Sequence, residues 1–141
     1  MTAKYFVDTN ILLYAVSKTP SESAKTAVAR EILGRNDIGI SVQVLQEFYV
    51  QATRAKPDAL THQQATNLVE SWLRFPVQLI SVQILVAALS TKDRFMISYW
   101  DAAIIEAARE MGCKNVVSED LADGRNYNGV IVVNPFVRAL V

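Results

Sequence analysis

One short stretch near the N-terminus constrains the fold more than any other. Tyr5–Val7 is an apolar, β-prone run, and it ends abruptly on a carboxylate, a hydroxyl and an amide, Asp8, Thr9 and Asn10. Such a run predicts a buried strand. In an open α/β sheet the crevice beyond the carboxyl ends of the strands binds ligands, which would place Asp8 at its rim. The alternative is that Asp8 or Thr9 only caps the helix expected over Ile11–Val16, because both are good N-cap residues.

The rest of the chain alternates short apolar segments with helical patterns. Strands are expected at 38–40, 77–80, 115–118 and 130–133. Helices are expected at 21–34, 42–56, 61–75, from Ser81 to a bend at 92–94, and at 99–111, and a polar loop is expected at 119–129. Strands that alternate with helices favour a parallel sheet with both faces covered. We therefore predict one domain over residues 1–141, a three-layer α/β/α fold with a central parallel sheet of about five strands.

Composition supports a globular domain and excludes several kinds of function. Half of the 141 residues are hydrophobic and a fifth are charged, which is typical of an ordinary globular fold. No apolar run approaches the roughly 20 residues that span a bilayer. The N-terminal residues also lack the pattern of a secretion signal. We therefore expect a cytoplasmic protein with no membrane partner.

The scarcity of cysteine and histidine narrows the possible chemistry. The chain holds one cysteine, Cys113, and one histidine, His62. This excludes a disulfide framework and any zinc site built from cysteine and histidine. It also argues against histidine-based cleavage of RNA. The 14 basic and 14 acidic side chains cancel, which is unlike a strongly basic DNA-binding protein. Neutrality remains compatible with an enzyme that holds a phosphodiester through metal ions.

Three acidic positions besides Asp8 stand out by their places in the pattern. Asp101 falls on an apolar helix face with Ile104, Ile105 and Ala108, opposite Glu106, Arg109 and Glu110. A carboxylate there costs free energy unless it is paired or binds a metal. The alternative is a capping box with Ser98. Glu47 lies two turns into the helix after the second strand and would otherwise be an ordinary solvated residue. Asp120 follows the fourth strand, where turn chemistry is the alternative.

These four carboxylates would meet at one edge of the predicted sheet. They would repel one another and raise their own pKa values unless a cation neutralised them. Oxygen-only ligands suit Mg²⁺ or Mn²⁺ better than zinc. Such an ion can activate water for attack on phosphorus and stabilise the leaving oxygen. Thr9, Asn10 and Ser118 could orient the carboxylates or a phosphate through hydrogen bonds.

With these residues identified, the chain resembles the PIN-domain family, and within it the VapC-type toxin ribonucleases. The resemblance covers nearly the whole chain. It rests on Val7–Asn10, Glu47, Trp100–Ala102, Ser118–Asp120 and Asn134–Phe136. It implies an endoribonuclease that depends on Mg²⁺ or Mn²⁺, an RNA substrate, a homodimer and a cognate antitoxin.

The same resemblance implies which residues hold the metal. The acidic quartet maps onto Asp8, Glu47, Asp101 and Asp120, with Asp8 and Asp101 as the main ligands. Glu119 and Asp123 also lie in reach of the loop. Asp120 is preferred because it matches the Thr/Ser-x-Asp spacing that follows the fourth strand.

Two other functions remain open at the level of sequence. An aspartate-based phosphatase of the haloacid-dehalogenase type would need Asp-x-Asp after the first strand, where this chain has Asn10 in the third place. A phosphoacceptor receiver domain would need a lysine at the end of the last strand, where Asn134–Pro135 stands. The other alternative is a catalytically inactive PIN-fold module that binds a protein through Ile11–Val16 or Phe136. Glycine-rich phosphate loops are absent, so nucleotide binding finds no support.

Overall fold

A six-stranded sheet lies at the centre of the structure, a computed structural model that describes residues 2–141. The strands are β1 (Tyr5–Val7), β2 (Ile38–Ser41), β3 (Val77–Gln78), β4 (Asn115–Val117), β5 (Asn126–Tyr127) and β6 (Val130–Val133). Their order is β3-β2-β1-β4-β6-β5. Neighbouring strands are parallel except β5 and β6, which are antiparallel. The predicted central parallel sheet is confirmed, with one strand more than expected.

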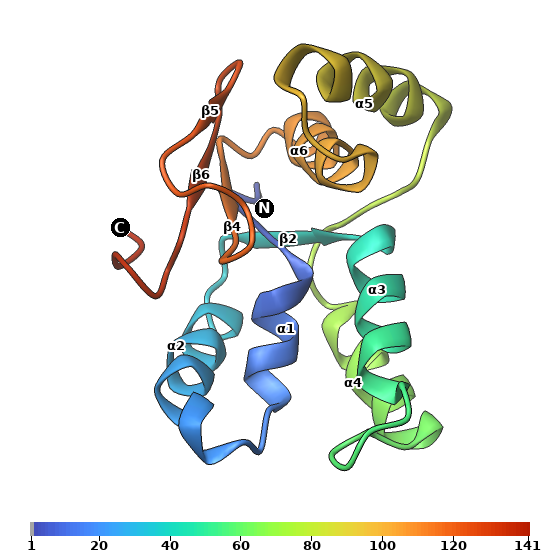
Figure 1. Cartoon of the computed structure of the whole chain (residues 1–141), viewed down its shortest axis with the longest axis vertical. Coiled ribbons are helices and arrows are strands. Elements are labelled where there is room, and N and C mark those ends of the chain that lie inside the picture. The colour runs from blue at the N-terminus through green and yellow to red at the C-terminus, as the bar shows by residue number, and fades with distance from the viewer. Residues whose placement is uncertain (1) are drawn as a thin grey trace.

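Helices cover both faces of this sheet and complete the predicted three layers. In Figure 1, α1 to α4 lie on one side of the sheet and α5 and α6 on the other. The helices are α1 (Thr9–Val16), α2 (Ser23–Leu33), α3 (Val42–Thr53), α4 (His62–Trp72), α5 (Val82–Phe95) and α6 (Tyr99–Met111), with a short 3₁₀ turn at Pro20–Glu22. Among the described residues, none of these helices has the length and apolar character needed to cross a bilayer.

β1 lies inside the sheet, and its side chains are apolar on both faces of the sheet. Phe6 and Val7 are completely buried. β1 pairs with β2 on one side and with β4 on the other, and its register aligns Val7 with Val117. The backbone N–H of Asp8 then donates to the Val117 carbonyl at 3.0 Å. The strand thus ends in line with β4, which brings the residues after both strands to one edge of the sheet.

Serine residues begin three helices. The Ser41 side chain accepts from Val44 N at 3.2 Å and the Ser81 side chain from Ile84 N at 3.1 Å, as the sequence predicts. Ser98 caps α6 in the same way. Gly112 ends α6 with a φ of 83°, a left-handed conformation that suits glycine. Local sequence therefore fixes where the site-bearing helices α3 and α6 begin.

Several predicted boundaries are wrong. Lys92–Arg94 lies inside α5, and the chain turns later, at Met96, whose φ is 56°. The polar segment 119–129 was expected to be a loop, but it contains β5, which pairs antiparallel with β6. α3 ends at Thr53, before the predicted residue 56. Pairing across the sheet, which a local pattern does not contain, explains the extra strand.

The structure also corrects the polar side predicted for the last helix. The predicted polar side includes Glu106, yet this residue is only 6% exposed. Its carboxylate accepts from Arg109 Nε at 2.9 Å and from Thr91 Oγ1 at 2.8 Å. Helix α5, which contributes Thr91, covers this part of α6. The ion pair makes the burial of Glu106 tolerable.

An apolar surface remains uncovered on and beside α5. The helix packs against α6 through Ile84 and Ala88, which are buried. Four of its other apolar side chains, Val82, Leu85, Val86 and Leu89, are exposed, and so are the two residues after β3. We call this surface the α5 face; it comprises Leu79, Ile80, Val82, Leu85, Val86 and Leu89, each 44% to 75% exposed.

Candidate active site

Asp8 stands at the end of β1 and uses both carboxylate oxygens. Oδ1 accepts from the backbone N–H of Thr9 at 2.8 Å, which caps α1. Oδ2 accepts from the Ser118 hydroxyl at 2.8 Å, across the sheet edge after β4. The side chain is 8% exposed. Asp8 is therefore a helix cap, as the simpler alternative holds, but capping occupies only one of its two oxygens.

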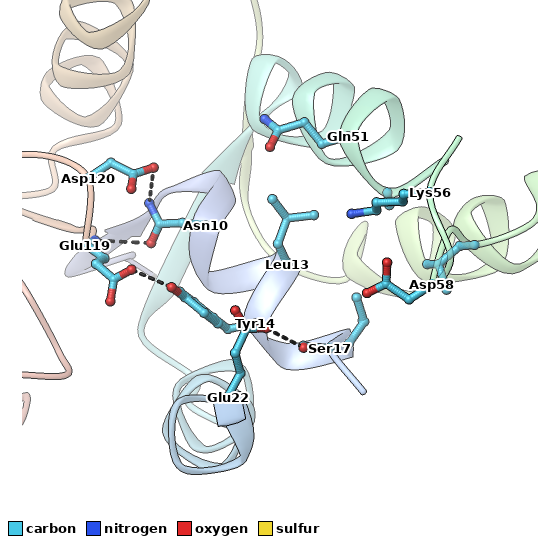
Figure 2. A pocket seen from close by; sticks show the side chains of 13 residues that line it. Asn10, Leu13, Tyr14, Ser17, Glu22, Gln51, Lys56, Asp58, Glu119 and Asp120 are labelled. Carbon is cyan, nitrogen blue, oxygen red and sulfur yellow. Dashed lines mark hydrogen bonds between the residues drawn. The ribbon is translucent and has the colours of Figure 1, made fainter. Parts of the chain in front are cut away.

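Asn10 connects the residues that follow β1 with those that follow β4. Its amide nitrogen lies 3.1 Å from Ser118 Oγ, 3.3 Å from Asp120 Oδ2 and 3.4 Å from Asp8 Oδ2. Its amide oxygen accepts from the backbone N–H of Glu119 at 3.1 Å. Figure 2 shows Asn10 between Asp120 and Glu119. One buried amide thus holds Asp120 and Asp8 at the same edge of the sheet.

Glu47 reaches the same edge from α3. Its Oε1 accepts from Thr9 Oγ1 at 3.2 Å and from Gln43 Nε2 at 3.4 Å. Partial burial raises the pKa of Glu47 above its usual value, and the negative charge of Asp101 adds to this rise against the two hydrogen bonds. Glu47 is therefore not an ordinary solvated helix residue.

Asp101 lies in the first turn of α6, partly buried. Its backbone N–H donates to Ser98 Oγ at 3.0 Å, which is half of the capping box considered above. Within residues 2–141 its carboxylate does not complete the box by accepting from Ser98. The carboxylate is therefore left free of that role. The charge of Asp101 acts on Glu47 of α3, and this links α6 to the other carboxylates. We call the four residues Asp8, Glu47, Asp101 and Asp120 the acidic cluster.

Burial dominates the electrostatics of Asp8. Removal from water raises the pKa of Asp8 from 3.8 to about 6, while the hydrogen bonds from Ser118 and Thr9 lower it. The charges of Glu47 and Asp120 raise the pKa of Asp8 further, by smaller amounts. Mutual repulsion was the cause expected from sequence, and it contributes less than burial. A nearby cation would offset both effects.

The three acidic residues after β4 occupy different surroundings. Glu119 accepts from Lys25 Nζ and Tyr14 Oη, each at 2.5 Å. Asp123 accepts from the Asn134 N–H at 2.8 Å and from Arg138 at 2.6 Å. Asp120 is exposed and faces Asn10.

The pKa values of these residues reflect the same difference in partners. Desolvation raises the pKa of Glu119, but the hydrogen bonds from Lys25 and Tyr14 outweigh it and leave that pKa below its usual value. The N–H of Asn134, followed by Arg138, lowers the pKa of Asp123. Both carboxylates are thus committed to cationic partners, which favours Asp120 as the free one.

A cavity of about 270 Å³ opens beside this cluster. Asn10, Glu119 and Asp120 form one end of it, and Tyr14 and Leu13 of α1 line its side. Figure 2 shows Gln51 of α3 above these residues, with Lys56 and Asp58 at the far end. A substrate segment could therefore lie along α1 and reach the acidic cluster.

The chemistry of the donor set fits a hard divalent cation, although its geometry is open. Asp8, Glu47, Asp101 and Asp120 offer only oxygen atoms, and the buried Asp8 carries a charge that is costly without a counter-ion. Within residues 2–141, however, no three acidic, histidine or cysteine side chains are grouped closely enough to hold a metal ion. The structure brings Asp8 next to Asp120 and Glu47, and Asp101 next to Glu47, without forming a closed set of ligands.

Sequence reasoning missed three residues that shape the site. Tyr14 lies within the apolar stretch Ile11–Val16, and the sequence pattern assigns no role to Lys25 or Gln43. Their roles depend on partners far away in the chain; Lys25 and Glu119, for example, are 94 positions apart. A local pattern carries no signal for such a contact.

The sequence and the fold both match known proteins. The family model of the PIN domain matches residues 5–122. No curated protein sequence is significantly similar to the chain.

Among solved structures, a toxin–antitoxin complex from Klebsiella pneumoniae aligns with a TM-score of 0.70 at 20% identity, over 94% of this chain and 98% of that one. The Mycobacterium tuberculosis VapC20 toxin, described as cleaving the sarcin-ricin loop, aligns with a TM-score of 0.65 at 17% identity, over 83% and 90%. A DNA-bound VapBC complex from Salmonella typhimurium gives 0.66 at 19% identity, over 93% and 97%. At such identities the likeness is one of fold, whereas the family model matches most of the chain itself. The chain therefore belongs to the PIN domain family.

Proposed function

We propose that this protein is an endoribonuclease that depends on Mg²⁺ or Mn²⁺ and acts as the toxin of a type II toxin–antitoxin pair. The observation that carries the proposal is the position of Asp8, a buried carboxylate at the end of the central strand with Glu47 and Asp120 as charged neighbours. Buried carboxylates with a raised pKa cluster at the functional sites of proteins.

We assign metal binding and the orientation of the carboxylates to different residues. Asp8, Glu47, Asp101 and Asp120 would hold the ion, which when bound supplies an activated water and charge stabilisation at the phosphate. Ser118 and Thr9 fix the orientation of Asp8 through their hydrogen bonds. Asn10 holds the Asp120 carboxylate near Asp8.

RNA is the proposed substrate because of the family and of one structural neighbour. That neighbour, VapC20, is described as cleaving the sarcin-ricin loop, which is an RNA element. The chain's own surface adds the cavity beside Asp120, which is open to an extended strand. An RNA substrate in turn implies a cytoplasmic place of action.

The proposed protein partners are an antitoxin and a second copy of the chain. Several structural neighbours are toxin–antitoxin complexes, which supports a cognate antitoxin. The α5 face supports a homodimer, because exposed apolar patches of this kind mark protein interfaces. Val86→Glu on this face should shift the mass measured by light scattering from dimer to monomer. Leu73→Glu, similarly exposed just after α4, should leave the dimer intact.

Cleavage of a labelled RNA by purified protein tests the enzymatic proposal. We expect cleavage with Mg²⁺ or Mn²⁺, none with EDTA, and recovery when the ion is restored. Asp101→Asn should abolish cleavage and preserve the circular dichroism spectrum. Glu110→Gln is the matched control, because Glu110 is exposed on the same helix. Full activity in EDTA or in Asp101→Asn would refute the proposal.

The α5 face also favours a second candidate, a PIN-fold module that binds a protein and cleaves nothing. This candidate needs the apolar surface and gives no role to the buried charge of Asp8. The two candidates differ in one measurement. A module would bind its partner equally well after Asp8→Asn and would show no cleavage of RNA with any divalent ion.

A further inference from the structure

The side chain of Trp100 is exposed and does not contribute to the hydrophobic core. Its side chain is 64% exposed, whereas the only other tryptophan, Trp72, is 4% exposed in the core. The ring touches Tyr99 edge to face, with centroids 5.1 Å apart. Trp100 directly precedes Asp101 at the start of α6. A large aromatic surface therefore stands open beside the acidic cluster.

A groove of about 360 Å³ runs between Trp100 and α3. Glu47 lines this groove and belongs to the acidic cluster as well. Gln43 Nε2 lies 3.4 Å from Glu47 Oε1 and 3.3 Å from the Trp100 carbonyl oxygen, so one side chain ties the groove to the site. The groove is thus continuous with the place where a phosphodiester would react.

The lining of the groove combines the Trp100 ring and Val50 with polar side chains. Gln43, Gln46 and Gln51 present amides, which can both donate and accept hydrogen bonds. Arg54 also lines the groove, and within residues 2–141 it forms no ion pair. A flat aromatic ring, neutral amides and one available cation match a nucleobase and its phosphate.

The groove and the cavity beside α1 share one lining residue. Gln51 lines both, and Figure 2 shows it at the upper rim of the cavity around Tyr14. A single strand could therefore pass from the cavity, across the cluster at Glu47, to Trp100. A base paired within a duplex could not stack on Trp100 in the same way.

We propose that the Trp100 groove binds an unpaired base of the RNA substrate next to the scissile phosphate. The base stacks on the Trp100 ring, and Arg54 binds a neighbouring phosphate. The proposal rests on the ribonuclease function proposed above and deepens it, because it assigns base binding to a groove lined by Trp100 and α3.

Fluorescence tests the groove directly because the chain contains two tryptophans. Asp8→Asn protein, used to prevent cleavage, is titrated with an unstructured eight-nucleotide RNA. We expect quenching from the exposed Trp100, with little change from the buried Trp72. The quenching should disappear in Asp8→Asn/Trp100→Phe, and a duplex of the same sequence should quench neither protein.

The affinity of Trp100 variants for the RNA shows whether a base stacks on the Trp100 ring. Trp100→Ala should weaken binding of the eight-nucleotide RNA by roughly 5- to 150-fold, the range usual for loss of one stacked base. Trp100→Phe should restore most of the affinity. Leu73→Ala removes an exposed apolar side chain far along the sequence, just after α4, and should change nothing.

The outcomes distinguish this proposal from the enzymatic one. Normal RNA cleavage with unchanged affinity in Trp100→Ala would overturn the groove alone. A changed oligomer mass in Trp100→Ala, with RNA affinity unchanged, would also overturn it and assign Trp100 to a protein interface. Failure of the unmodified protein to bind or cleave RNA would overturn both proposals.

Discussion

Replacing Asp8 by asparagine should make the metal-free protein more stable while it destroys activity. Burial raises the pKa of Asp8 from 3.8 to about 6, so the charged form costs the folded state about 3 kcal/mol at pH 7. The asparagine side chain would carry no charge. It would still cap α1 through its amide oxygen, but the Ser118 hydroxyl would lose its acceptor, at a cost of about 1 kcal/mol. The net expected gain is about 2 kcal/mol.

The sign of this effect depends on pH in a specific way. Because the folded pKa of Asp8 lies above the unfolded value, the folded state holds the proton more tightly. Asp8 therefore contributes most favourably to the free energy of unfolding below about pH 4. Its contribution becomes less favourable between about pH 4 and pH 6 and stays constant above about pH 6. The gain from Asp8→Asn should therefore reach its full size at pH 7. At pH 4 the substitution should instead destabilise the protein by about 1 kcal/mol, because only the lost hydrogen bond remains.

Thermal unfolding in EDTA at both pH values measures this gain. About 2 kcal/mol corresponds to a rise in Tm of roughly 6 °C for a domain of this size. Asp123→Asn is the matched control. The N–H of Asn134 and the side chain of Arg138 lower the pKa of Asp123, so its loss should lower Tm. A lower Tm for Asp8→Asn at pH 7, or an equal rise at both pH values, would refute the reasoning.

Three further predictions concern other charged or reactive groups. Arg109→Ala should destabilise the protein by a few kcal/mol in urea unfolding, because it leaves buried Glu106 unpaired, and Arg109→Ala/Glu106→Gln should recover part of the loss. Burial raises the pKa of Cys113 to about 11, so the native thiol should not react with a disulfide reagent at pH 8 until the protein unfolds. Lys25→Met should raise the pKa of Glu119, followed by carboxyl NMR titration, because Lys25 supplies a hydrogen bond that lowers it; an unchanged pKa would contradict this contact.

The fold could be predicted from sequence to the extent that local patterns specify it. Buried strands such as Tyr5–Val7 read as continuous apolar runs, and the caps at Ser41 and Ser81 fix where two helices begin. The strand Asn126–Tyr127 could not be found in this way, because two residues in a polar segment become a strand only by pairing with β6. The helical state of Lys92–Arg94 likewise depends on the packing of α5 against α6.

The candidate site could be predicted as a set of residues but not as a geometry. Strand ends and helix starts indicated Asp8 and Asp101, and the resemblance to a family ordered them with Glu47 and Asp120. The resemblance preferred Asp120 to its acidic neighbours by spacing alone. The ion pairs of Glu119 with Lys25 and of Asp123 with Arg138 could not be predicted from the sequence, because they join separate parts of the chain. The roles of all four carboxylates remain predictions.

Each of the four acidic residues is attached to a different element, so the site depends on the whole sheet. Asp8 follows β1 and Asp120 follows β4, while Glu47 and Asp101 lie on helices that serine caps begin. These elements are spread along most of the chain, and the pairing of β1 with β2 and β4 aligns them. The charge on Asp8 therefore becomes costly only when this alignment buries it. If the proposed function is correct, the free energy that the folded protein loses there is recovered by the cation it binds.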